Sequence, residues 1–155
     1  MNNPNDNFEL AQPIYLYKTP MFLVTVSTVL IFENGVILVK TGEQYAFPNI
    51  VIKAGQETAS FAAIRSVKEQ TGIVLKRNSL LPVDVRSEPE RTPSKNIIDL
   101  GMVSILEEEP ENKKAQWFEI DFENKCMRDH KLQLWGDYNV LLSRAIDIVW
   151  IMKDS

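Results

Sequence analysis

The fold is decided by residues 57–73, which read Glu-Thr-Ala-Ser-Phe-Ala-Ala-Ile-Arg-Ser-Val-Lys-Glu-Gln-Thr-Gly-Ile. Alanine and charged residues dominate this stretch, and most of them favour a helix. Gly72 stands where a glycine commonly ends a helix in the left-handed conformation. The stretch therefore predicts a helix over residues 57–71.

The residues before this helix predict a β-hairpin. Residues 21–32 are apolar and rich in β-branched side chains, as is typical of a strand buried on both faces. Asn34-Gly35 follows, and this dipeptide accepts positive φ at both central positions of a tight turn. Residues 35–40 return as the second strand, and residues 45–48 and 49–53 are expected to be short extended pieces.

The residues after the helix complete an α+β pattern. Strands are expected over residues 80–85, 96–107 and 116–120, with a loop rich in proline and charge at 86–95. Apolar residues at helical spacing predict a final helix over 129–153, with Asp129 as its N-cap. This order predicts an α+β domain that has a mixed β-sheet with helices on its faces. We expect a disordered or extended lead-in over residues 1–18 and a single domain over 19–155.

Composition narrows the classes of protein. A chain of 155 residues that is 45% hydrophobic and 25% charged has the size and composition of one globular domain. A net charge of −4 gives no basic field for nucleic acid or anionic membrane. The longest apolar run, residues 21–32, is shorter than the roughly 20 residues that span a bilayer. The single cysteine, Cys126, excludes a disulfide framework within the chain and favours a cytoplasmic location.

The stretch that begins at Glu57 resembles the second half of the Nudix box of MutT-like pyrophosphohydrolases, G-x5-E-x7-R-E-U-x-E-E-x-G-U, in which U is aliphatic. The matching positions are Glu57, Arg65, Val67, Glu69, Gly72 and Ile73. The Trp117-Phe118 and Asp129-His130 pairs resemble segments of the ADP-ribose-pyrophosphatase-like branch. The resemblance implies a Nudix-type α/β/α sandwich with a mixed β-sheet. It also implies Mg²⁺- or Mn²⁺-dependent hydrolysis of a nucleoside diphosphate linked to another moiety.

Two departures from the box fall on positions that hold the metal in the family. Ser66 and Gln70 stand where the box has glutamates. Residues four apart on a helix project from the same face, so two carboxylates there could bind one cation. A hydroxyl and an amide supply oxygens without charge, and we therefore expect the affinity for Mg²⁺ to be lower by orders of magnitude. Glu69 is the family metal ligand that remains on this helix.

The resemblance also implies that Glu57 and Arg65 form an ion pair that braces the loop before the helix. Because the two residues are eight positions apart, Glu57 must lie on the loop and fold back to reach Arg65. The candidate catalytic residues are therefore Glu69, Glu57 and Arg65. The same residues also fit a plain reading, in which the alanine-rich face packs on the sheet and Arg65 and Glu69 form a solvated pair.

Other candidates lie outside the box. Arg86 and Arg91 flank the loop 86–95 and could bind substrate phosphates, because an arginine fork matches phosphate oxygens; solvated loop charges are the alternative. A late metal ligand or a base could come from acidic residues near the expected cleft, which are Asp84, Glu88, Glu90 and Asp99. The three tryptophans are expected to pack against apolar neighbours.

The sequence supports two functions. The first is an impaired Nudix hydrolase that needs Mg²⁺ or Mn²⁺. The second is a non-catalytic Nudix-fold module that binds a nucleotide or a protein partner and needs no metal. In both cases a nucleotide-type small molecule is the expected ligand, with no nucleic acid and no membrane as partner. A homodimer and a monomer fit the sequence equally well.

Overall fold

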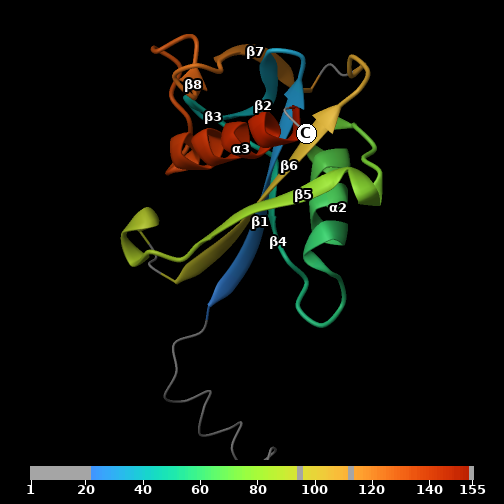
Figure 1. Cartoon of the computed structure of the whole chain (residues 1–155). Coiled ribbons are helices and arrows are strands. Elements are labelled where there is room, and N and C mark those ends of the chain that lie inside the picture. Colours follow the sequence, from blue (N-terminus) through green and yellow to red (C-terminus); the bar gives the residue numbers. More distant parts are fainter. Residues whose placement is uncertain (1–21, 94–95, 112–113, 154–155) are drawn as a thin grey trace, which may run out of the picture.

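The computed structural model describes residues 22–93, 96–111 and 114–153 (Figure 1). The strands are β1 (Leu23–Phe32), β2 (Gly35–Thr41), β3 (Gln44–Ala46), β4 (Asn49–Val51), β5 (Leu80–Arg86), β6 (Ile97–Leu106), β7 (Gln116–Asp121) and β8 (Cys126–Met127). The α-helices are α2 (Ala59–Thr71) and α3 (Tyr138–Lys153), and short 3-10 turns lie at Arg77–Ser79 and Pro89–Arg91. The lead-in expected over residues 1–18 lies outside the described residues.

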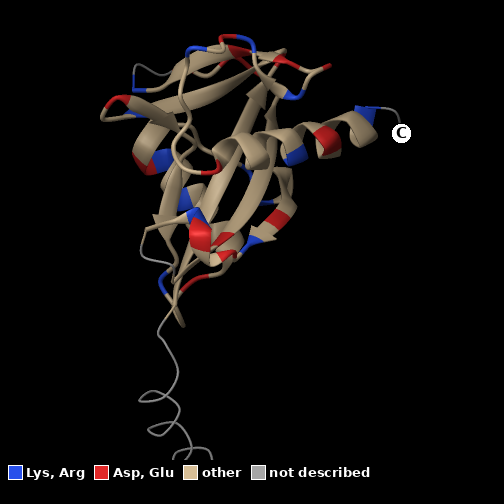
Figure 2. Ribbon diagram, turned by 90° about the vertical axis from the view of Figure 1, so that its left-hand side faces the viewer, with Lys and Arg blue, Asp and Glu red and all other residues tan. Residues whose placement is uncertain are grey.

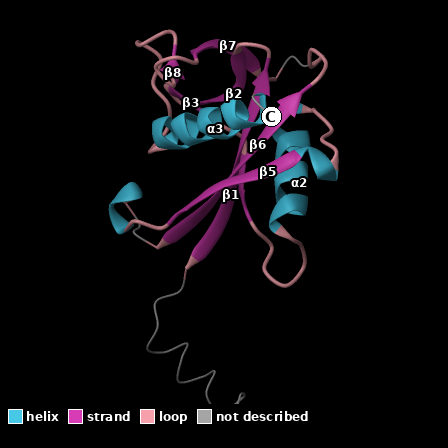
Figure 3. Ribbon diagram, in the orientation of Figure 1, coloured by secondary structure: helices cyan, strands magenta, loops and turns pink. Residues whose placement is uncertain are grey.

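The strands form a mixed sheet in the order β5-β6-β1-β2-β7-β8, with β4 paired to β1 and β3 paired to β2 (Figure 3). The strand β1 pairs in parallel with β6 along its whole length, from Leu23↔Ile97 to Phe32↔Leu106. All other strand pairs among the described residues are antiparallel. The predicted β1–β2 hairpin is present, but its two turn residues are Glu33 and Asn34, one position earlier than the Asn34-Gly35 pair that the sequence favours. Gly35 already pairs with Phe32 as the first residue of β2, and the positive φ falls on Glu33.

The two helices cover opposite faces of this sheet. Successive side chains of a strand point to opposite faces, and on β1 Val26 packs in a cluster with Ala62 and Ala63 of α2. Val29, three positions along, packs in a second cluster with Leu141 and other residues of α3. The arrangement is the predicted α/β/α sandwich with a mixed sheet.

The ends of both helices differ from the sequence predictions. The helix α2 begins two residues later than expected, because Thr58 is its N-cap and Glu57 precedes it. The helix α3 begins at Tyr138, so the prediction that it starts at Asp129 is wrong. The Asp129 carboxylate instead accepts the Lys131 N–H at 3.0 Å within a local turn. The apolar spacing of residues 129–137 resembles that of a helix, but Leu134 is buried because it forms an isolated parallel β-bridge with Tyr45. Gly136, with a φ of 56°, then turns the chain before α3 begins.

Candidate functional site: the helix α2 and strand β4

The helix α2 is fixed at both ends by its own sequence. The Thr58 hydroxyl accepts the Phe61 N–H at 3.1 Å, and such a cap satisfies a backbone donor that has no partner within the helix. At the other end Gly72 adopts a left-handed φ of 78° and donates its N–H to the Lys68 carbonyl. Ala62 and Ala63 are fully buried against the sheet and permit a close approach of the helix. The positions of Ser66, Glu69 and Gln70 follow from this placement.

Glu57 and Arg65 form the predicted ion pair. The Arg65 guanidinium donates to the two Glu57 carboxylate oxygens at 2.6 and 3.1 Å. The Lys53 N–H donates to the same carboxylate at 2.9 Å, and Arg65 also reaches the Val51 carbonyl at 3.4 Å. The Arg65 hydrogen bonds, followed by that of Lys53, lower the pKa of Glu57 to about 2. The pair therefore ties the loop before α2 to both the helix and β4.

Ser66 and Gln70 make neutral hydrogen bonds at the contact between α2 and β4. The Gln70 Nε2 donates to the Asn49 carbonyl at 2.6 Å and to the Ser66 hydroxyl at 3.3 Å. The Gln70 Oε1 accepts the Asn49 N–H at 3.3 Å. The Ser66 side chain is fully buried, while Gln70 and Asn49 are half-buried. We call Asn49, Ser66 and Gln70 the α2–β4 seam.

Glu69 lies beside the seam and points to solvent. Its side chain is 57% exposed, and its carboxylate lies 3.8 Å from the Arg65 guanidinium. An exposed pair at this distance holds the two side chains only weakly. Arg65 therefore makes both predicted contacts: the solvated i,i+4 pair with Glu69 and the more buried pair with Glu57.

Arg86 lies in a different environment from the solvated loop that its sequence context suggests. It is the last residue of β5, is 1% exposed, and contacts the carboxylates of Asp99 and Asp137, the latter at 2.5 Å. Arg91 donates to Asp137 at 2.7 Å from the 3-10 turn that follows β5. Burial raises the pKa of Asp99 although the charge of Arg86 opposes this. Both arginines are thus engaged by carboxylates, and binding a substrate phosphate would require these ion pairs to open.

Asp99 lies on the face of the sheet opposite to α2. Its carboxylate accepts hydrogen bonds from Thr25 at 2.5 Å and Ser27 at 2.8 Å, and the Ser27 hydroxyl meets the Tyr138 hydroxyl of α3 at 2.8 Å. Asp99 therefore cannot join Glu69 around one ion. The other acidic candidates are equally engaged or exposed: Asp84 pairs with Arg144 at 2.5 Å, and Glu88 and Glu90 are exposed.

Comparison with known proteins agrees with this architecture. No protein-family model matches the sequence. The chain is 29% identical over 126 residues to the ADP-ribose pyrophosphatase of Methanocaldococcus jannaschii. The aligned region covers 75% of this chain and 72% of that protein. It superposes on a MutT/nudix family protein from Enterococcus faecalis with a TM-score of 0.74 and 18% identity, over 96% of this chain and 75% of that one. The chain is a Nudix-fold protein.

A second solved structure shares this Nudix fold and contains a nucleotide ligand. The NUDIX domain of Shewanella oneidensis NrtR, solved with ADP-ribose, has a TM-score of 0.68 and 14% identity over 89% of this chain and 98% of that one. The similarity to an ADP-ribose pyrophosphatase therefore rests on sequence, and the solved structures show the shared fold.

The residues of α2 and of the seam do not fit a tightly held divalent cation. Mg²⁺ and Mn²⁺ prefer anionic oxygens, and each requires several of them close together. At the seam the atom that faces the Asn49 carbonyl is the Gln70 amide nitrogen, which is a donor and cannot be a ligand. Among the described residues, no three His, Cys, Asp or Glu side chains are grouped as metal ligands. Glu69 is the carboxylate that α2 itself could contribute as a metal ligand beside the seam.

Sequence reasoning missed the partners of Gln70 and Arg86. The Gln70 amide meets a backbone segment 21 residues away, and Arg86 meets Asp137 across 51 residues. A local signal did exist for the second network, because Asp99 interrupts the apolar strand Ile97–Leu106 and a buried carboxylate needs a cationic or hydrogen-bonding partner.

The surface of the described residues carries both signs of charge. Figure 2 shows the positions of Lys and Arg interspersed with those of Asp and Glu along the ribbon of the described residues. In the part of the chain that the structure describes, no helix has the length and apolar character needed to cross a membrane.

Proposed function

We propose that this protein binds a nucleoside diphosphate linked to a second moiety, of the ADP-ribose type, and hydrolyses it much more slowly than a Nudix hydrolase with the full set of glutamates. The ligand class is supported by the similarity to an ADP-ribose pyrophosphatase and by a fold neighbour solved with ADP-ribose. The slow hydrolysis rests on one observation, the hydrogen bonds of Gln70 to Asn49 and Ser66. An amide in this position holds the two elements together without a cation.

The divalent metal of the family would supply charge stabilisation of the pyrophosphate and activation of water. Glu69 retains its carboxylate, so residual metal-dependent turnover would depend on this residue. A non-catalytic nucleotide-binding module is the limiting case of the same proposal, in which that residual turnover is zero. The cytoplasmic location remains a prediction from the sequence, which fits a homodimer and a monomer equally well.

The experiment measures binding and turnover of ADP-ribose separately. Titration calorimetry without added metal should detect binding, and product analysis with millimolar Mg²⁺ or Mn²⁺ should show turnover far below the roughly 10 s⁻¹ that is ordinary for enzymes. Residual turnover should disappear in Glu69→Gln and persist in Glu43→Gln, an exposed control that removes the same charge. Turnover at an ordinary enzymatic rate would refute the impairment, and absence of ADP-ribose binding would refute the ligand class.

A further inference from the structure

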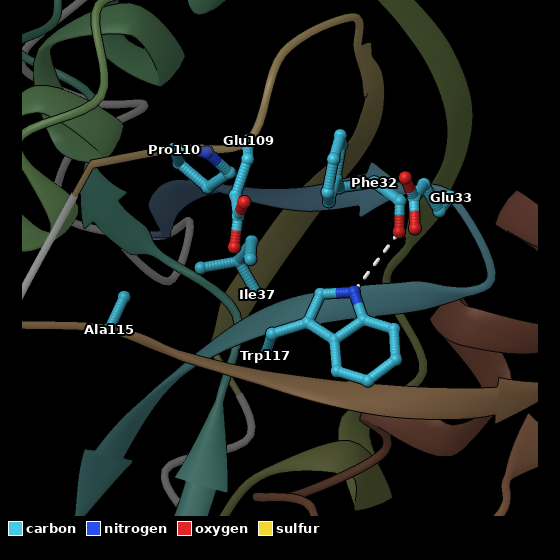
Figure 4. Close-up of a pocket in the computed structure, with 7 residues that line it drawn as sticks. All are labelled: Phe32, Glu33, Ile37, Glu109, Pro110, Ala115 and Trp117. Atoms are coloured by element: carbon cyan, nitrogen blue, oxygen red, sulfur yellow. Dashed lines mark hydrogen bonds between the residues drawn. The ribbon is translucent and has the colours of Figure 1, made fainter.

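A cavity of about 400 Å³ lies at the turn end of the β1–β2 hairpin (Figure 4). The residues that line it include Phe32, Glu33, Ile37, Glu109, Pro110 and Trp117. They come from the hairpin, from the loop after β6 and from β7. The cavity shares no lining residue with the α2–β4 seam or with Glu69.

The indole of Trp117 is held in a fixed orientation beside this cavity. Its N–H donates to the Phe32 carbonyl at 3.0 Å, so its polar atom is satisfied (Figure 4). The ring lies against the backbone of Gly35, since a Cβ placed on that glycine would come within 2.2 Å of the indole Cε2. The Trp117 side chain nevertheless remains 43% exposed. Trp117 is thus held by a hydrogen bond and by its contact with Gly35, is partly exposed, and is one of the residues that line the cavity.

Two carboxylates share the cavity with this aromatic surface. Glu33 lies in the hairpin turn with a positive φ of 52°, which is uncommon for a residue other than glycine. Glu109 follows β6, and its side chain points towards Ile37 in Figure 4. The cavity therefore combines negative charge with aromatic and apolar walls.

We propose that this cavity binds an organic cation, either a guanidinium or an alkylammonium group, against the Trp117 indole. The face of an aromatic ring attracts cations, and tryptophan does so most strongly. The two carboxylates add attraction for the same charge and would repel a phosphate or carboxylate ligand. The apolar walls formed by Ile37 and Pro110 match a planar guanidinium or an alkyl chain better than a hydrated metal ion, which requires more oxygen ligands.

The test compares a cation with its neutral isostere. N-acetyl-arginine methylamide should bind the intact protein with a millimolar dissociation constant and shift the NMR signal of the Trp117 indole N–H. The matching citrulline derivative, which lacks the charge, should not bind. In Glu33→Gln/Glu109→Gln the affinity for the arginine probe should fall roughly three- to tenfold, whereas Glu43→Gln removes a distant exposed charge and should leave the affinity unchanged.

A second arm identifies the source of the cation. If a short arginine-containing peptide binds at least tenfold more tightly than the free derivative, the cation is a side chain of a protein partner; equal affinities indicate a free small amine. Equal binding of the arginine and citrulline probes would overturn the proposal. An unchanged affinity in the double variant, with thermal melts showing that it is folded, would overturn it as well.

Discussion

Replacing Gln70 by glutamate tests how the α2–β4 seam is held together. In the parent, the Gln70 Nε2 donates to the Asn49 carbonyl at 2.6 Å. In Gln70→Glu at neutral pH a carboxylate oxygen takes the place of that nitrogen, and no proton lies between it and the carbonyl. Loss of one partner of a buried hydrogen bond costs about 1–3 kcal/mol. Since both residues are half-buried, we expect a loss of about 1–2 kcal/mol, which lowers Tm by about 2–8 °C for a chain of this size.

The effect of Gln70→Glu should depend on pH in a defined direction. A protonated glutamate can again donate to the Asn49 carbonyl, so the pKa of Glu at this position should lie above its ordinary value in the folded state. A group whose folded pKa is raised stabilises the fold at low pH, and this contribution disappears as the pH rises through the folded pKa. The difference in Tm between parent and variant should therefore be largest near neutral pH and smallest near pH 4.

Divalent cations should rescue the same variant. A carboxylate at position 70 beside Glu69 and the Asn49 carbonyl offers oxygens to Mg²⁺ or Mn²⁺, and a ligand at 100 times its Kd stabilises the folded state by about 2.7 kcal/mol. Adding Ser66→Glu places a larger, charged side chain at a fully buried position, which costs about 1–3 kcal/mol without metal. With metal, the gain in affinity of the double variant should exceed the sum of the single gains, because both side chains would contact one ion.

Thermal melts and calorimetry with and without Mg²⁺ measure these effects. Gln56→Glu is the matched control, because it makes the same chemical change at an exposed position before α2. If Gln70→Glu melts with the parent at every pH, the amide does not hold the seam. If Mg²⁺ raises Tm equally in the parent and in both variants, the missing glutamates are not the reason for weak cation binding.

Three further substitutions test the ion pairs. Glu57→Gln should lower Tm at pH 7 by weakening the bond to Arg65, and this difference from the parent should vanish in melts as the pH falls from about 4.5 towards 2, where the parent carboxylate is itself protonated. Asp99→Ala should cost about 1–3 kcal/mol in urea unfolding, because it removes one of the carboxylates that pair with the buried Arg86 guanidinium while Asp137 remains; an effect below about 1 kcal/mol would contradict this. Arg144→Gln breaks a pair at 2.5 Å whose arginine is 48% exposed, and should cost less than about 1 kcal/mol in the same assay.

The predictable part of the fold is the part specified by local sequence. The hairpin follows from the turn signal around Asn34, although the turn lies one residue earlier than the Asn34-Gly35 pair, and the helix α2 follows from its composition and from Gly72. The Glu57–Arg65 pair could be predicted because the resemblance to the Nudix box fixed the register of both residues. The end of the last helix was predicted and its beginning was not, since the apolar residues near Leu134 serve a strand-like bridge that local periodicity cannot distinguish from a helix.

The buried charges could not be placed because their partners come from distant elements. The segment that begins at Arg86 has the sequence of a polar loop, but Arg86 is the last residue of β5. The neighbouring strand β6 carries Asp99, and Asp137 lies just before α3; both carboxylates contact Arg86. Such a site depends on strand order and on the path of the chain before α3. Neither can be read from the few residues around each charge.

The two faces of the sheet use different means to hold a helix. On one face the residue before α3, Asp137, joins the sheet through a network in which Arg86 pairs with Asp99 and Asp137, and Arg91 pairs with Asp137. On the other face the seam brings the Asn49 carbonyl and the Ser66 hydroxyl together around the Gln70 amide. The two hydrogens of the Gln70 amide nitrogen satisfy both oxygens without a cation. Because the amide is part of the chain and cannot dissociate as a bound cation can, these hydrogen bonds join α2 to β4 without metal.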